Sequence, residues 1–346
     1  MPRTWPGAAN SCALSAIRGN FYLAFFTSFV IILLYNNMEF KKIKKTISRF
    51  FAWIGLNTCV LFGKILPQPL LYGFAGMVAR IGYLCAARQR TVAIESLKTA
   101  FGAEKSDEER KAIARQCFVS MAKSGVEIMF LVDKPDLLRR KVNFLHKERL
   151  DNALKEGKGV ILVSAHFGNF PLLLGRLSLE GYRTGGIMRP MRDARAEKIF
   201  LQKRNRYGIK TIYSQPRKEC VEETVRSLRN NEIVFIPLDQ NFGTGGVFVD
   251  FFGTKAATAT GPAILAQRTQ AALLPCFIVR QPDDTHQIIF EEPLRISDGG
   301  GCDPAQVVEI IQSLTRVIES YIRQYPAEWG WIHRRWKSKP SVKGGE

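Results

Sequence analysis

The chain has 346 residues, a formal net charge of +19 and 46% hydrophobic residues. This length suits one large α/β domain with an N-terminal addition, or two domains. The hydrophobic content excludes a basic disordered tail, and the excess of Lys and Arg predicts an anionic partner, such as nucleic acid, phospholipid headgroups or a phosphorylated substrate.

Cysteine and histidine are too scattered to indicate a disulfide framework or a zinc site. The 7 cysteines are odd in number and never form a C-x-x-C pair. The 4 histidines do not form a motif such as H-E-x-x-H. We therefore expect a reducing compartment and no metal site.

The N-terminal part carries an apolar run, Phe21–Tyr35. At about 15 residues it is short of the roughly 20 that a spanning helix needs. The lysines that follow favour an uncleaved anchor with the main body in the cytoplasm, and no cleavage pattern indicates a signal peptide. Alternatively, Met38 is the true start, and residues 1–37 are translated upstream sequence.

The next stretch, Phe50–Ala87, is apolar but interrupted by Pro67 and Pro69. It predicts two hydrophobic helices that lie in or on a bilayer, with a buried helical hairpin as the alternative. Ser106 to Glu109 then forms a capping box. The box predicts a helix whose apolar face carries Ile113, Cys117, Met121 and Val126.

From residue 157 onward, strand-like and helix-like segments alternate. The predicted strands are residues 160–165, 184–188, 233–238, 273–279 and 287–290. The predicted helices are residues 171–179, 195–207, 220–230, 262–269 and 305–325. This alternation predicts an α/β fold with a mostly parallel central sheet flanked by helices.

Polar side chains follow three of these strands: His166 after the first, Arg189 after the second, and Asp239 with Gln240 after the third. The carboxyl ends of parallel strands share one edge, where open α/β sheets bind ligands. His166 has an ordinary pKa near ~6.5 and is a candidate general base. The alternatives are a loop histidine, an arginine paired with a surface carboxylate, and an aspartate that caps a turn.

Two further segments are expected to contribute to a ligand-binding crevice at this edge of the sheet. A hydrophobic loop or strand, Val247–Gly253, leads through an Ala/Thr-rich turn to a helix start at Gly261, whose free N–H groups attract anions. Near the C-terminus, residues 329–337 interleave tryptophan with arginine and lysine. RNA-binding surfaces and membrane interfaces both have this composition. The apolar N-terminal half favours a membrane, with packing of the tryptophans on the sheet as the alternative.

Several ordered blocks resemble the bacterial lauroyl/myristoyl lipid A acyltransferase family, within the glycerolipid acyltransferase superfamily. The resemblance runs from about Lys41 to Pro340. It rests on RTVAIESLKTAF from Arg90, the SAHFGN block, the Arg189-Pro190 pair, PLDQ from Pro237, FFG from Phe251 with the Ala/Thr stretch, Glu292-Pro293 and WIHRRWKSKP. Together with the apolar N-terminal run, it predicts three parts: an anchor or upstream segment (1–37), a helical membrane-associated region (38–150) and an acyltransferase domain (151–340).

The resemblance implies transfer of a fatty acyl chain from an acyl-carrier-protein or coenzyme A thioester to a hydroxyl of a lipid A precursor. The expected place is the cytoplasmic face of the bacterial inner membrane, with membrane lipids and acyl-carrier protein as partners and with no nucleic acid or cofactor. His166, Arg189 and Asp239 are the expected catalytic residues. The expected substrate-binding residues are Gly168, Asn169, Gln240, Gly261 and Arg334, with backbone N–H groups near Gly168 and Asn169, or Arg189, stabilising the oxyanion.

One departure stands out, because the family pattern places Asp or Glu five positions after the histidine and this chain has Pro171 there. Asp239 or Asp193, brought across the crevice, is expected to orient His166 instead. If neither does, His166 works without an orienting acid, which is costly in serine proteases. A catalytically impaired lipid-binding homologue is therefore one alternative. Acylation of another lipid acceptor (a phospholipid, an aminolipid or a mannosylated inositol lipid) is a separate alternative.

Overall fold

The computed structural model describes residues 46, 67–131, 133–191, 193–294 and 303–340. The chain divides into two compact units, Met1–Thr58 and Cys59–Glu346, and every element below belongs to the second unit. Three sequence predictions lie outside the described residues: the run Phe21–Tyr35, the start at Met38, and the part of Phe50–Ala87 that precedes Pro67.

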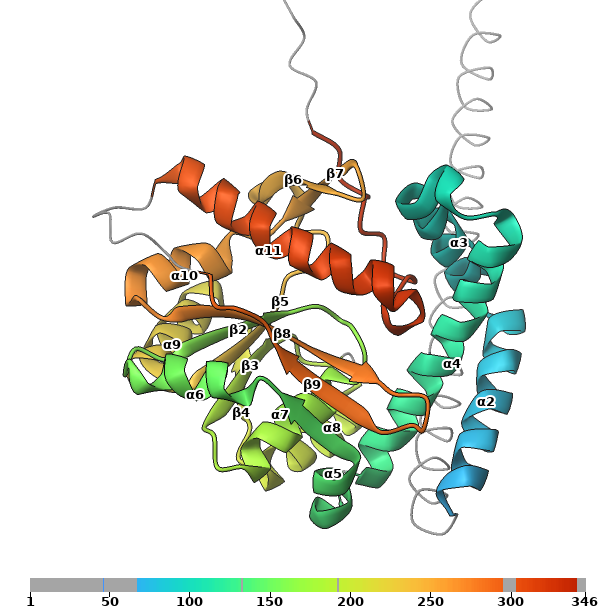
Figure 1. The fold of residues 1–346 in the computed structure, drawn as a ribbon, viewed down its shortest axis with the longest axis horizontal. Coiled ribbons are helices and arrows are strands. Elements are labelled where there is room, and N and C mark those ends of the chain that lie inside the picture. Colours follow the sequence, from blue (N-terminus) through green and yellow to red (C-terminus); the bar gives the residue numbers. More distant parts are fainter. Residues whose placement is uncertain (1–45, 47–66, 132, 192, 295–302, 341–346) are drawn as a thin grey trace, which may run out of the picture. The chain divides into compact units, whose positions relative to one another are not determined.

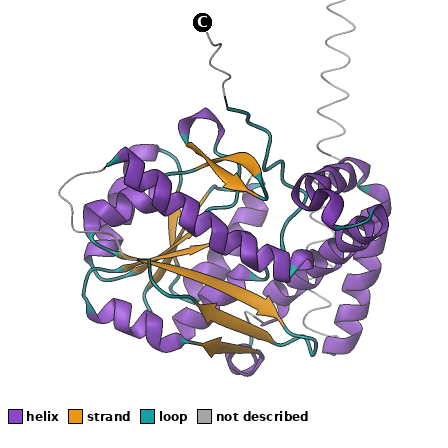
Figure 2. Cartoon of the chain, turned by 45° about the horizontal axis from the view of Figure 1, so that its top comes forward, coloured by secondary structure: helices purple, strands orange, loops and turns teal. Residues whose placement is uncertain are grey.

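A seven-stranded sheet forms the centre of the second unit, in the order β1-β9-β8-β2-β5-β3-β4 (Figures 1 and 2). Its strands are β1 (Val142–Leu145), β2 (Val160–Ser164), β3 (Thr184–Met188), β4 (Lys210–Tyr213), β5 (Ile233–Pro237), β8 (Ala272–Arg280) and β9 (His286–Phe290). Among the described strands of this sheet, β8 and β9 are the one pair that runs antiparallel. The mostly parallel sheet is confirmed, and β1 and β4 are additions to the prediction.

The five helices predicted after β2 lie close to their predicted bounds. They are α7 (Phe170–Leu179), α8 (Ala194–Arg206), α9 (Arg217–Arg229), α10 (Gly261–Thr269) and α11 (Pro304–Gln324). The segment that was expected to be a loop or strand followed by a turn is an antiparallel hairpin, β6 (Val247–Phe251) with β7 (Thr254–Thr258).

Both faces of the sheet are buried, which is why its central strands are continuously apolar. Ile161 and Val163 of β2 point into one hydrophobic cluster, which also contains apolar residues of α10 and α11. Val160 and Leu162 point into the other cluster, which also contains apolar residues of α7. The central strand β2 is therefore fixed from both sides, and so is the position at which it ends.

The described chain before β2 is mostly helical: α2 (Gln68–Cys85), α3 (Ala87–Phe101), α4 (Asp107–Leu131), α5 (Pro135–Lys141) and α6 (Lys147–Lys155), with β1 between α5 and α6. The capping box at the start of α4 is present, since the Ser106 N–H donates to Glu109 at 2.7 Å and the Glu109 N–H donates to the Ser106 hydroxyl at 3.3 Å. Ile113, Cys117 and Val126 are buried as predicted, whereas Met121 is 44% exposed.

These helices pack into the same hydrophobic clusters as the sheet, so packing does not break near residue 150. Helix α2 lies along α4 (Figure 1). No single helix among the described residues is long and apolar enough to cross a membrane; α2 with Ala87–Glu104 meets that test only as a pair bent by 89°.

Candidate active site

His166 lies just beyond the carboxyl end of β2, the strand that pairs with β8 and β5. Its ring packs edge-on against Phe170, with 5.4 Å between the ring centroids. The side chain is 37% exposed. One side of the imidazole is thus held by the fold while a substrate can reach the other.

The turn after His166 requires glycine. Gly168 has φ +55, and a Cβ there would lie 2.0 Å from the carbonyl oxygen of Ile278 on β8. The Gly168 N–H donates to the Glu328 carbonyl at 2.8 Å. This N–H is therefore engaged within the protein, and the expectation that it stabilises an oxyanion is not met in this conformation.

Asp239 is the partner of His166. It follows β5, directly beside β2, and its Oδ1 lies 2.8 Å from Nδ1 of the imidazole. The other oxygen, Oδ2, accepts a hydrogen bond from the Trp329 indole at 2.7 Å. Asp239 is only 4% exposed, so the carboxylate is fixed at both oxygens in a buried position. The expected approach of Asp239 to His166 is confirmed as a contact.

The electrostatics of the pair follow from burial and charge. Burial lowers the pKa of His166, but the charge and hydrogen bond of Asp239 outweigh it and leave the pKa raised. Burial raises the pKa of Asp239, yet His166 and the Trp329 hydrogen bond bring it down to about 2. Asp239 is thus ionised at neutral pH and stabilises a proton on the imidazole.

Gln240 completes the immediate surroundings of the imidazole, because its Nε2 lies 3.3 Å from Nε2 of His166. When Nδ1 carries the proton and donates to Asp239, Nε2 is a bare lone pair. This nitrogen can accept from the Gln240 amide or remove a proton from a bound hydroxyl. The arrangement is that of a general base with an orienting carboxylate.

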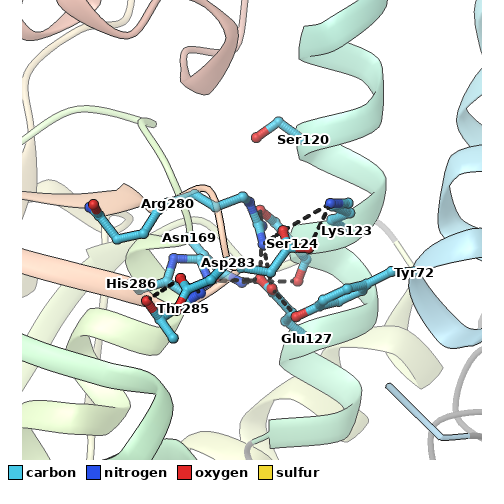
Figure 3. A network of polar contacts seen from close by, with 12 residues as sticks. Tyr72, Ser120, Lys123, Ser124, Glu127, Asn169, Arg280, Asp283, Thr285 and His286 are labelled. Carbon is cyan, nitrogen blue, oxygen red and sulfur yellow. Dashed lines mark hydrogen bonds and ion pairs between the residues drawn. The ribbon is translucent and has the colours of Figure 1, made fainter. Parts of the chain in front are cut away.

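A second polar cluster is centred on Glu127 of α4 (Figure 3). Glu127 is fully buried. Its carboxylate accepts from Tyr72 of α2 at 2.6 Å, Asn169 at 2.9 Å, Arg280 at 2.9 Å and His286 at 3.2 Å. The cluster connects two helices, two strands and the loop that carries His166.

Glu127 holds its charge despite complete burial. Burial raises its pKa, but hydrogen bonds from His286 and Arg280 and their charges bring it well below the usual range. Burial of a charge is tolerated only with such pairing. Sequence reasoning missed this cluster, because Arg280 and His286 lie 153 and 159 residues from Glu127 in the chain.

Comparison with known proteins gives the family. A model of the bacterial lipid A biosynthesis acyltransferases matches residues 37–338. The chain belongs to this family. It is 27% identical over 300 residues to a lipid A biosynthesis palmitoleoyltransferase of Escherichia coli K12, and 25% identical over 298 residues to the lauroyltransferase of the same organism. Both alignments cover 84% of this chain and 92% of the relative.

A second group of relatives acts on a different lipid by name. A phosphatidylinositol mannoside acyltransferase of Mycobacterium tuberculosis H37Rv is 28% identical over 194 residues, covering 55% of this chain and 58% of the relative. All these relatives are named acyltransferases, so this family member is an acyltransferase acting on lipid A or a related lipid.

Within this acyltransferase, the expected site residues separate into two groups. His166, Asp239 and Gln240 lie together. Arg189 follows β3, which is separated from β2 by β5, and is exposed. Two strand spacings amount to about 10 Å. Among the described residues, Arg189 makes no hydrogen bond to the other three, so its predicted role has no contact to support it.

The remaining expected residues lie outside this contact group. The Asn169 side chain turns into the Glu127 cluster, with its amide donating to Glu127 and to the Ser124 carbonyl. Gly261 begins α10, and Arg334 is exposed. Within the described part of the chain, neither of these two hydrogen-bonds to His166 or Asp239. Asp193, the alternative acid, caps α8 and pairs with Arg195 instead.

The C-terminal tryptophans are not an interfacial surface, which corrects the sequence interpretation. Trp329, Trp331 and Trp336 are 1%, 0% and 8% exposed. Each indole N–H has a partner inside the protein: Asp239, the Pro326 carbonyl and the Phe251 carbonyl, respectively. Buried tryptophan needs such a partner for its N–H. The segment is a packed support for the site.

Arg335 in the same segment is fully buried and supports the loop after β5. Its guanidinium donates to the Gln240 carbonyl at 3.1 Å, and also to the Ala257 carbonyl and the Thr258 hydroxyl at 2.6 Å each. Burial lowers the pKa of Arg335 to about 10, which still leaves it charged at neutral pH.

Proposed function

We propose that this protein transfers a fatty acyl chain from an acyl-carrier-protein or coenzyme A thioester to a hydroxyl of a lipid A precursor at the cytoplasmic face of the inner membrane, with His166 as general base. The observation that carries the proposal is the 2.8 Å contact between His166 and Asp239 at the carboxyl edge of the sheet. The family and its lipid A relatives supply the reaction type and acceptor class.

In the proposed reaction, Nε2 of His166 takes the hydroxyl proton while the oxygen attacks the thioester carbonyl. Asp239 stabilises the resulting imidazolium through Nδ1. The tetrahedral intermediate then collapses, the carbon–sulfur bond breaks, and the imidazolium returns its proton to the leaving thiolate. An ester and a free thiol are formed, and no covalent acyl-enzyme is needed.

The intermediate carries a negative oxygen that needs donors. The side-chain amide of Gln240 lies beside Nε2 of His166 and is such a donor. Arg189 is a cation at the same edge of the sheet and is proposed to bind an anionic part of a substrate, two strands away from the base. Gly261, at the start of α10, where free N–H groups attract anions, and Arg334, in the WIHRRWKSKP block, are proposed substrate contacts.

The exposed side of α2 is proposed to bind the membrane. One face of this helix packs inward through Leu71, Ala75 and Ala79. The other side exposes large apolar side chains that recur at helical spacing: Leu70 (61%), Met77 (50%), Val78 (42%), Ile81 (53%) and Leu84 (70%). An exposed apolar stripe beside a strongly basic chain suits the surface of an anionic bilayer.

Acylation of another lipid is the second candidate, and the phosphatidylinositol mannoside acyltransferase relatives favour it. The experiment is mass spectrometry of the lipids of a host strain with and without this gene. Loss of one secondary acyl chain from lipid A is expected. Unchanged lipid A together with a changed phospholipid or glycolipid would overturn the acceptor while leaving the reaction type.

A non-catalytic lipid-binding homologue is the alternative from another class, suggested by Pro171 in place of the family acid. The Asp239 carboxylate weighs against it, because it supplies the missing partner of His166. Purified protein with acyl thioester and lipid A precursor distinguishes the two. Turnover by the wild type that is lost in His166→Ala supports an enzyme; equal release of thiol with and without protein would favour a binding protein.

A further inference from the structure

We propose that Trp329 is a positioning residue for acyl transfer: its indole N–H fixes the carboxylate that orients His166. This inference rests on the proposed role of His166 as base. Trp329 itself does not touch the reacting atoms, and it acts through Asp239.

The two oxygens of Asp239 have separate partners. Oδ1 lies 2.8 Å from Nδ1 of His166, and Oδ2 lies 2.7 Å from Nε1 of Trp329. The terminal torsion of an aspartate is soft, so a carboxylate with one partner can rotate. With a donor on each oxygen, the plane of this carboxylate is set, and with it the tilt of the imidazole.

The indole N–H of Trp329 has a well-defined position because the side chain is buried and closely packed. It is 1% exposed and packs against Trp331 and Phe251, with ring centroids 4.6 and 5.7 Å away. Its carbonyl accepts from the Cys117 thiol at 3.1 Å. Because the packing locks the rotamer of this side chain, its N–H holds the Asp239 carboxylate in one orientation.

The same segment also holds the loop that carries His166. Trp329 forms a β-bridge with Phe167, the residue after His166. The preceding residue, Glu328, accepts from the Gly168 N–H at 2.8 Å. One short stretch of chain therefore fixes the base through its backbone and the acid through a side chain, so the distance between them is set by a single element.

The residues after Asp239 are held in the same way. Arg335 donates to the Gln240 carbonyl at 3.1 Å, and the Asn241 N–H donates to His333 at 3.0 Å. His333 accepts only when it is neutral, and burial lowers its pKa, which favours that form. Residues of the C-terminal segment thus contact Asp239, Gln240 and Asn241 in turn, and Trp329 makes the contact with the acid.

A buried tryptophan also stabilises a fold by packing alone, so the test separates the N–H from the ring. Trp329→Phe keeps an aromatic ring and removes the donor. Trp331→Phe is the matched control: Trp331 is 0% exposed, and its N–H donates to the Pro326 carbonyl at 2.6 Å, away from the acid. Acyl transfer, its pH profile and thermal unfolding are measured for both in the full chain.

We expect Trp329→Phe to lower kcat by roughly 10- to 100-fold with KM for the acyl donor unchanged, as for other partners that orient a functional group. Its pH profile should shift as well, because His166 and Asp239 titrate as a coupled pair. Among the described residues, His333 and Arg335 are further titratable groups that interact with this pair. Trp331→Phe should keep the wild-type profile. Equal kcat and equal pH profiles in the two variants would overturn the inference.

A double-mutant cycle with Asp239→Asn adds a readout that a structural role does not move. If Trp329 acts through Asp239, Trp329→Phe should cost little further activity in the Asp239→Asn background. Fully additive losses would contradict the inference. If His166→Ala is as active as the wild type, the proposed function itself fails; if only the tryptophan comparison fails, the proposed function stands.

Should Trp329→Phe not fold, the wild-type protein provides the measurement. The indole N–H signal of Trp329 in an NMR titration should move with the protonation of His166, because both bind one carboxylate. The signal of Trp331 should stay constant through the same pH range. A Trp329 signal that ignores the titration of His166 would overturn the inference without any variant at that position.

Discussion

His166 and Asp239, 73 residues apart in the chain, meet through Nδ1 and Oδ1 at 2.8 Å because they end two adjacent parallel strands. The neighbouring ends of β2 and β5 bring the acid to the base without any acid in the segment after His166. Pro171 can therefore occupy the first turn of α7, where proline is favoured.

His166→Ala should reduce acyl transfer at least about a hundredfold, the low end of general-base effects. Folding should be kept, since the imidazole is 37% exposed and contributes little to the core. The rate is measured by thiol release and by mass of the acylated product. His146→Asn is the control and should be fully active, because His146 is an exposed histidine at the start of α6. Unchanged turnover in His166→Ala would exclude it as base.

Asp239→Asn should lower turnover strongly and shift its pH dependence. A base must be neutral, so activity falls as pH drops through the raised pKa of His166. Removing the aspartate charge leaves burial as the remaining effect, and burial lowers this pKa. The acidic limb of kcat/KM should therefore move to lower pH while the plateau falls.

The control for this prediction is Asp193→Asn, which tests the other acid that the sequence suggested. Asp193 caps α8 and pairs with Arg195, and asparagine keeps a capping side chain. We expect wild-type turnover and an unmoved acidic limb. An active Asp239→Asn with an unshifted profile, or an inactive Asp193→Asn, would reverse the assignment.

The sequence predicts the central sheet well because buried parallel strands are continuous apolar runs, as β2 and β5 are. It misses β1 and β4, which are only 4 residues long and partly exposed. It does not predict the β6–β7 hairpin, because β7 is rich in Ala and Thr and has no clear alternation of apolar and polar residues. Short or weakly patterned strands are fixed by their partners, which a local pattern does not contain.

The candidate site is predicted in part for the same reason. Strand-end position identifies His166, Asp239 and Gln240. The role of Trp329 as a donor is not readable, because tryptophan between cations has the composition of a membrane interface as well as of a core. Glu127 carries no local signal either, since two of its partners, Arg280 and His286, lie more than 150 residues away.

Glu127→Gln should destabilise the protein by about 3–5 kcal/mol, the cost of leaving a buried charge without its partner. The charge left behind is Arg280, whose side chain is 9% exposed. The free energy of unfolding is measured by denaturant titration. Glu108→Gln on the same helix is the control, because its pair with Lys111 is exposed and should contribute under about 1 kcal/mol.

The pH dependence of stability has a defined sign for this cluster. The pKa of Glu127 is lower in the folded protein than in the unfolded chain, so its stabilisation is present above the unfolded value near ~4.3. It is lost as pH falls through the folded pKa. The stability difference between wild type and Glu127→Gln should therefore shrink in acid, and a difference that grows toward low pH would contradict the charge argument.

The last prediction concerns membrane binding. Because the three tryptophans are buried, we expect the exposed apolar side of α2 to make the contact with the membrane. A chain that begins at Met38 should sediment with anionic vesicles at low salt. Added salt should weaken the electrostatic part, because the screening length is about 10 Å at 0.1 M. Replacing Leu70, Ile81 and Leu84 with serine should reduce sedimentation further, since full burial of each large apolar side chain is worth about 1.5–3 kcal/mol.

Val308→Ser on α11 is the matched control, because Val308 is also exposed (38%) but lies outside the α2 stripe. It should sediment like the parent chain. If the triple serine variant also sediments like the parent, α2 is not the contact surface. If the parent chain from Met38 stays wholly in the supernatant at low salt, the surface of the described residues does not bind the bilayer, and the segment before Met38 becomes the anchor to test.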